Sequence, residues 1–158
     1  MRDDPRSSPT TAAAGEVIAR QNTLEATRAA MHPGCVLCGA SNPLGFRLQF
    51  TVQPDFSIAA TFRCPEALES YPGTVHGGVV SALLDAAMTN VLFSLGVVAV
   101  TAELAVRFVA PVRPRMHALL RGALTRTTSH ALYHVEADIV QDGVVVARAS
   151  AKFRATSS

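Results

Sequence analysis

The segment from Gly77 to Gly96 most constrains the fold, because it predicts a helix that is buried on every side. No helix-breaking residue occurs between Val79 and Leu95, and Gly96 has the position of a C-terminal glycine. Apolar residues occur all around this helix, at positions 79, 80, 83, 84, 86, 87, 88, 91, 92, 93 and 95. Such a helix is typical of a protein core, and at about 25 Å it is short for a membrane span. We therefore expect the rest of the chain to cover it.

Asp85 is the one ionisable residue of this helix. Burying a carboxylate is costly unless the group is paired, hydrogen-bonded or used in chemistry. Thr89 follows four residues later and shares its helix face. Two interpretations stay open: a structural carboxylate that caps a loop, or a group that takes part in a reaction.

The start of the helix is suited to binding an oxyanion. A Pro72-Gly73 turn leads to His76 and the pair Gly77-Gly78. The first helical turn leaves backbone N–H groups unpaired and carries partial positive charge, and glycines let a ligand approach the backbone closely. An oxyanion site followed by a buried carboxylate suits acyl chemistry, although the glycines could also serve tight packing alone.

The run from His76-Gly77-Gly78 to Asp85 resembles the HGG-to-Asp signature of hotdog-fold acyl-CoA thioesterases, in particular the PaaI-like group of phenylacetate degradation. The resemblance covers roughly residues 31–155. It implies hydrolysis of an acyl-CoA to the free acid and CoA. The N–H of Gly77, with Gly78, would hold the thioester oxygen, and Asp85 would act as general base or nucleophile.

The resemblance also implies roles for several polar residues. Thr89 and Thr101 match positions that help to place the attacking water, and Ser70 falls where relatives carry a polar side chain that orients the catalytic group. Each could equally be an ordinary helix, strand or loop residue. His76 resembles the family histidine before the glycine pair, but a role in capping the loop is at least as compatible with its position.

Composition argues against several other classes of protein. The net charge is only +2, from 14 basic and 12 acidic residues, so no nucleic-acid or membrane-surface preference is predicted. Neither a dinucleotide-binding glycine pattern nor a GxSxG nucleophile elbow occurs. The N-terminus lacks an apolar signal core, and we expect a cytoplasmic protein. The mechanism calls for no cofactor and no metal.

The first residues divide into two segments. Residues 1–15 are rich in Ser, Thr, Pro and Ala and predict a disordered tail. Residues 16–30 predict a short peripheral helix, ended by His32-Pro33-Gly34. Residues 31–155 would form the single hotdog domain.

His32, Cys35 and Cys38 have a spacing that raises the possibility of a zinc site. A structural zinc site needs four ligands, and a second CxxC is absent; Cys64 could complete the set only if the fold brings it close. The alternative, which we favour from the sequence, is a tight turn with buried thiols in a reducing compartment.

The remaining segments alternate polar and apolar residues with the period of a strand. Strands are predicted at 46–53, 57–64, 98–109, 116–126, 131–140 and 144–153, with an Asp142-Gly143 hairpin turn before the last one. In 98–109 the alternation puts Val100 and Leu104 on one face and Thr101 on the other. The order predicts an α+β hotdog domain, an antiparallel sheet wrapped around one long central helix.

The apolar strand 98–109 contains no proline and is suited to pair with its copy in a second subunit. The family resemblance implies a homodimer or homotetramer with shared active sites. Arg113 and Arg115 could contact the CoA phosphates, although solvated strand faces are the commoner place for arginine. Two rival functions remain open: a hotdog enoyl-acyl hydratase or dehydratase, and a non-catalytic acyl-CoA-binding protein.

Overall fold

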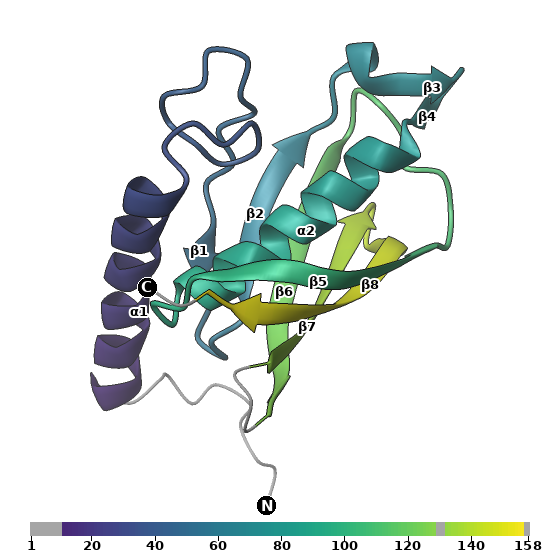
Figure 1. Cartoon of the computed structure of the whole chain (residues 1–158). Helices are drawn as coiled ribbons and strands as arrows, with labels where there is room; N and C mark the ends of the chain where they lie inside the picture. The colour runs from purple at the N-terminus through teal and green to yellow at the C-terminus, as the bar shows by residue number, and fades with distance from the viewer. Residues whose placement is uncertain (1–10, 129–131, 157–158) are drawn as a thin grey trace, which may run out of the picture.

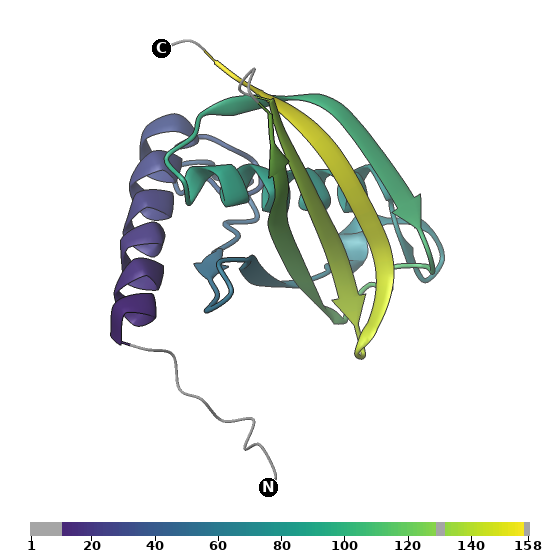
Figure 2. The ribbon, with the colours of Figure 1, turned by 90° about the horizontal axis from the view of Figure 1, so that it is seen from below.

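The computed structural model describes residues 11–128 and 132–156. Within them, six strands form one antiparallel sheet in the order β1-β2-β6-β7-β8-β5, and two further strands form a separate hairpin. The sheet curls around the helix α2, and α1 stands at one end of it (Figures 1 and 2). In chain order the elements are α1 (Thr11–Met31), β1 (Thr51–Val52), β2 (Ile58–Arg63), the 3₁₀ turn η1 (Glu66–Leu68), β3 (Glu69–Tyr71), β4 (Thr74–Val75), α2 (Gly77–Phe93), β5 (Ala99–Phe108), β6 (His117–Thr127), β7 (Leu132–Gln141) and β8 (Val144–Ala155). This arrangement confirms the predicted α+β hotdog fold.

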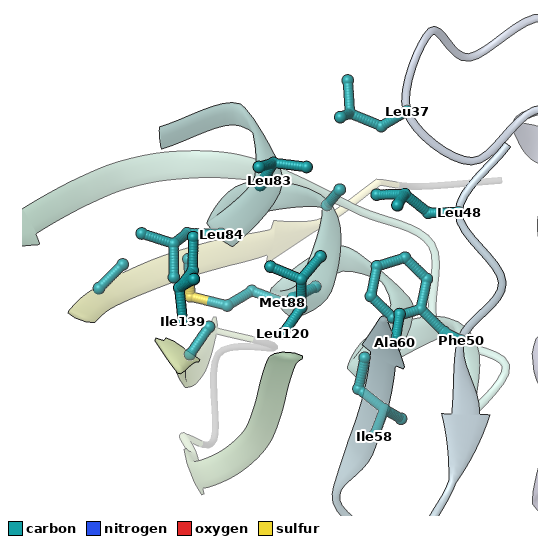
Figure 3. Close-up of a cluster of buried hydrophobic side chains, with 14 of the residues drawn as sticks. Leu37, Leu48, Phe50, Ile58, Ala60, Leu83, Leu84, Met88, Leu120 and Ile139 are labelled. Atoms are coloured by element: carbon teal, nitrogen blue, oxygen red, sulfur yellow. The ribbon is translucent and has the colours of Figure 1, made fainter. Parts of the chain in front are cut away.

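The central helix α2 is buried as its composition predicts. Figure 3 shows Leu84 and Met88 meeting Leu120 and Ile139 of the sheet, and all four are fully buried. Each such side chain stabilises the fold by about 2 kcal/mol. The helix ends at Phe93, and Gly96 closes the turn that follows: its φ is +69°, and the N–H groups of Gly96 and Val97 bond back to the carbonyl oxygens of Phe93 and Leu92, as in a Schellman motif. No helix of the described residues is long and apolar enough to cross a membrane.

The N-terminal helix is longer than predicted. It begins at Thr11, so residues 11–15, which we assigned to a disordered tail, are helical. Three alanines at 12–14 have the highest helix propensity of any residue, which outweighs the neighbouring Thr and Gly. Residues 1–10 of that predicted tail lie outside the described residues. Leu24 anchors α1 in the core, with no exposed surface.

For the first predicted strand, 46–53, the alternation of buried and exposed side chains is correct, but most of the expected strand pairing is absent among the described residues. Leu48, Phe50 and Val52 are buried while their neighbours are exposed, but only Thr51 and Val52 pair with β2. Arg47 has a φ of +52°, which interrupts the extended chain. On either side of Arg47, the N–H groups of Phe46 and Leu48 bond instead to the carbonyl oxygens of residues 36 and 37. A small hairpin, β3–β4, which we did not predict, carries the Pro72-Gly73 turn.

The alternation predicted for β5 is wrong in its first half. Thr101 lies opposite Phe153, which is fully buried in the core. Directly opposite residues of an antiparallel pair share a face, so Thr101 points toward α2 and Val100 away from it. The register shifts between Thr101 and Glu103, and this β-bulge restores the predicted inward direction at Leu104. The bulge thus brings a polar side chain onto the helix face of the sheet.

Candidate active site

The start of α2 holds the predicted histidine as a helix cap. His76 is the N-cap residue, and its Nδ1 accepts a hydrogen bond from the N–H of Gly78 at 2.9 Å. The sequence predicted that the N–H groups of both Gly77 and Gly78 could hold an oxyanion. Because the N–H of Gly78 is already bonded to His76, only that of Gly77 is left for this role. The N–H of Gly77 has no acceptor among the described residues. This capping geometry agrees with the structural alternative for His76.

An aromatic side chain from β5 lies against this helix start. A Cβ atom added at Gly77 would sit 3.4 Å from the Phe108 ring. A side chain at this position would therefore begin in van der Waals contact with the ring. Ser81, one turn further on, donates a hydrogen bond to the carbonyl oxygen of Gly77 at 2.9 Å. The start of α2 is therefore held by this hydrogen bond and lies beside the Phe108 ring.

Asp85 is held from the sheet. Its Oδ1 accepts a hydrogen bond from Oγ1 of Thr101 at 2.7 Å, and its side chain is half-buried. The two residues are sixteen positions apart. Their contact depends on the β5 bulge, and no local sequence pattern reveals it. Thr89, predicted on the same helix face, is buried and lines the same small pocket as Asp85.

This pocket has a volume of about 100 Å³ and contains groups that the sequence did not connect with Asp85. Its lining includes His32, Cys35 and Cys38, together with Asn90 of α2. Burial lowers the pKa of His32, and the nearby Asp85 carboxylate opposes that shift. Burial raises the pKa of the Cys38 thiol to about 11, against a lowering contribution from the Asn90 side chain.

The third cysteine does not join this cluster. Cys64 is fully buried elsewhere in the core, and burial alone raises the pKa of its thiol to about 11. All three cysteines are unbridged. The idea that Cys64 supplies a fourth ligand to His32, Cys35 and Cys38 is therefore wrong.

The other predicted binding residues lie away from the Asp85 pocket. Ser70 is exposed on β3. Arg113 and Arg115 are exposed and form ion pairs with Asp142 and Glu66. The loop before them reaches the helix start, because the N–H of Val75 bonds to the carbonyl of Val112 at 2.8 Å. Binding of substrate by these side chains remains a prediction.

A larger groove, of about 690 Å³, is lined by residues from β5 to β8 and from the turn before β2. It contains none of the predicted catalytic residues. Two of its charged residues, Arg121 and Asp138, already form a bidentate pair at 2.8 and 2.7 Å. Size alone therefore does not identify the reactive site, and the predicted catalytic residues lie instead on α2, beside the inner face of β5.

Comparison with known proteins gives the same fold and a match to one family model over part of the chain. The model of the Thioesterase superfamily matches residues 72–147. The E. coli PaaI protein of the phenylacetic acid degradation operon aligns with a TM-score of 0.73 at 14% identity, covering 90% of this chain and 96% of that one.

Two further solved structures are similar. A hypothetical thioesterase protein from Streptococcus pneumoniae TIGR4, solved with coenzyme A, has a TM-score of 0.64 at 20% identity, and the alignment covers 70% of this chain and 87% of that one. A phenylacetic acid degradation-related protein from Ralstonia eutropha JMP134 has a TM-score of 0.63 at 21% identity, with 74% and 94% covered. No curated protein matches the chain. The chain is therefore similar to the thioesterase superfamily over α2 and most of the sheet, and it shares the hotdog fold with PaaI and the other solved structures.

Proposed function

We propose that this protein hydrolyses an acyl-CoA thioester to the free acid and CoA, with Asp85 as the catalytic carboxylate. The observation that carries the proposal is the 2.7 Å hydrogen bond from Thr101 to Asp85 on a helix whose first N–H has no acceptor within the described chain. The bond orients the carboxylate and leaves its second oxygen available to a water molecule. The unpaired N–H supplies the donor that an oxyanion needs.

The two halves of this machinery are too far apart to act together within one chain. Gly77 and Asp85 are separated by eight residues of α2, which is about 12 Å along the helix axis. A thioester carbonyl that accepts a hydrogen bond from Gly77 therefore lies beyond the reach of a water molecule on Asp85 of the same chain. A complete site requires a second copy.

The strand β5 suggests how the second copy is placed. Its first half carries Thr101, bonded to Asp85, and its last residue, Phe108, lies against Gly77. If β5 pairs antiparallel with the β5 of a partner, the start of one strand lies beside the end of the other. Gly77 of one protomer then lies near the partner's Asp85. We therefore propose a homodimer with two shared sites; whether two dimers associate further is a separate question.

The chemistry follows from these positions. Asp85 removes a proton from a water molecule as the water oxygen attacks the thioester carbon, and the N–H of Gly77 stabilises the resulting oxyanion. The C–S bond then breaks, the acid is released, and the CoA thiolate takes the proton from Asp85. Direct attack by Asp85 would instead expel the CoA thiolate and form a mixed anhydride. If water then attacks the Asp85 carboxyl carbon and releases the acid, a single turnover in ¹⁸O water labels the Asp85 side chain, which the general-base route does not.

Two similar proteins that were solved with CoA compounds support a CoA ester as substrate. The Streptococcus pneumoniae protein was solved with coenzyme A, and a Streptococcus mutans protein with acetyl CoA. Variants of the former replace an aspartate and a threonine with alanine, and those two residues have the same sixteen-residue separation as Asp85 and Thr101. In this chain Arg113 and Arg115 are candidates for contacts with the CoA phosphates. To make these contacts, each arginine would release its exposed carboxylate partner and bind a phosphate in its place.

The test replaces Asp85 with asparagine, which has nearly the same shape but cannot act as base or nucleophile. Release of free thiol from short, long and aromatic acyl-CoAs first identifies a substrate for the wild type. Asp85→Asn should then lower kcat by at least ~10², with the oligomer and the melting temperature preserved. Asp55→Asn, at an exposed turn, is the matched control and should keep the wild-type kcat.

Three outcomes would contradict the proposal. A well-folded Asp85→Asn protein with wild-type hydrolysis would exclude the catalytic assignment. A lower melting temperature with activity that falls only with the folded fraction would make Asp85 structural. A wild type that releases no CoA but hydrates an enoyl-CoA would indicate the hydratase.

A further inference from the structure

The turn after α1 collects three metal-binding side chains that the proposed hydrolysis does not use. Nδ1 of His32 and the Sγ atoms of Cys35 and Cys38 lie within 4.8 Å of one another. The Sγ of Cys38 is 3.8 Å from Nδ1 of His32. The three residues are part of one short turn packed against α2, so their closeness does not depend on any long-range strand register.

The backbone of this turn is shaped around the sulfur atoms. The N–H of Leu37 donates to Sγ of Cys35 at 3.4 Å, and the N–H of Gly39 bonds to the Cys35 carbonyl at 3.0 Å. A Cβ at Gly39 would sit only 2.4 Å from the backbone nitrogen of Cys35, so this tight path requires glycine. An N–H directed at sulfur stabilises negative charge on it, which is the form in which cysteine binds a metal.

Two neighbouring side chains on α2 complete the surroundings. Phe93 packs edge-on against the ring of His32, with 4.8 Å between centroids, and limits the ring's rotation. Asn90 is fully buried and lines the same pocket, and its Oδ1 has no hydrogen-bond partner among the described residues. A buried amide oxygen without a donor costs about 1–3 kcal/mol. A water molecule bound to a metal in this pocket would supply that donor.

We propose that His32, Cys35 and Cys38 bind one Zn²⁺ ion, whose fourth tetrahedral position faces the pocket beside Asp85 and holds a water molecule. Thiolate and imidazole ligands together suit zinc, and three protein ligands with one open position are a recurrent zinc geometry. Zinc–ligand bonds of about 2.0–2.3 Å place the ligand atoms ~3.5–3.8 Å apart. The Cys38–His32 pair has this spacing already, and the widest separation has to close by about 1 Å.

The test measures metal content and therefore does not depend on whether the protein hydrolyses acyl-CoA. The full chain, purified without chelators, should contain zinc in equimolar amount by elemental mass spectrometry. After removal of zinc and addition of Co²⁺, it should show thiolate-to-cobalt charge-transfer absorption and the visible bands of a tetrahedral site. Cys35→Ala and Cys38→Ala should lose both the metal and these bands.

Cys64→Ala is the matched control, because Cys64 is an equally unbridged thiol outside the cluster, and it should keep the metal. If the cluster variants do not fold, titration of the folded wild type with a mercurial reagent replaces them: zinc should be released as thiols react. A zinc-free wild type that gives no cobalt spectrum would overturn the proposal. So would a Cys35–Cys38 disulfide in the purified protein, or metal retained equally by all three variants.

Discussion

The two edges of the six-stranded sheet are completed in different ways. β1 is two residues long and is covered by α1, because the Gln21 side chain accepts from the N–H of Val52 at 2.8 Å and donates to the carbonyl of Phe50 at 3.2 Å. β5 is ten residues long, and no strand of the described chain pairs with its outer edge. Val100 and Phe108 on it are 56% and 55% exposed.

An open, apolar edge strand is a hazard that proteins normally cover or charge. The chain does this at β1 with one glutamine and leaves β5 uncovered, although β5 also carries the threonine that holds Asp85. Under the proposed function, the covered edge serves stability alone, and the open edge serves assembly and chemistry together. Changes at the two edges should therefore have different consequences.

The largest effect is expected from Leu104→Arg on β5. A buried charge at the proposed contact would separate the protomers and leave each site with only one of its halves, so hydrolysis should fall by at least ~10². Light scattering after size exclusion should show the monomer mass. Leu119→Arg is the control for an added charge away from the open edge, since Leu119 is 38% exposed and Leu104 37% and Leu119 lies on β6 within the sheet. Because Leu104 faces α2 and Leu119 faces away from it, circular dichroism has to show that both variants are folded. Equal effects of the two variants would mean that β5 has no special role.

A smaller effect is expected from Thr101→Val, which keeps the shape of the β5 side chain and removes the donor to Asp85. Hydrogen bonds to charged groups contribute about 1.5–3 kcal/mol, so kcat should fall roughly 10- to 100-fold. The oligomer mass and KM should not change. Thr51→Val, on the β1 edge, should leave kcat as in the wild type. If Thr101→Val has full activity, the hydrogen bond to Asp85 is only structural.

The smallest effect on activity is expected from Gln21→Ala at the covered edge. It leaves the N–H of Val52 and the carbonyl of Phe50 without their side-chain partner, which costs about 1–3 kcal/mol, or several degrees in melting temperature. Thermal unfolding should show this loss, while mass and kcat stay unchanged. Asn22→Ala, its exposed neighbour on α1, should leave the melting temperature nearly unchanged. If Gln21→Ala instead lowers the mass of the oligomer to that of the monomer, the two edges do not differ in the way proposed here.

Most of the fold was predictable because its signals are local. The Asp142-Gly143 turn has the positive φ values, +50° and +76°, that its sequence predicts. The candidate site was predictable only in part. Asp85, Thr89 and Gly77 are on one helix, whose phasing relates them directly. His32 and Cys38 reach the Asp85 pocket through the docking of a separate segment, which no spacing in the sequence reveals.

The sequence by itself determined the central helix, because a mostly apolar segment without a helix-breaking residue, followed by Gly96, favours a buried helix. Only the tertiary structure decided which residues meet Asp85. The bulge after Thr101 reverses the alternation of β5, and the segment before β1 bonds to the turn that carries Cys35 and Cys38 instead of extending the sheet. Both outcomes depend on pairing between distant segments. Register is set cooperatively by the whole sheet and its core, so it is not encoded in any single stretch of residues.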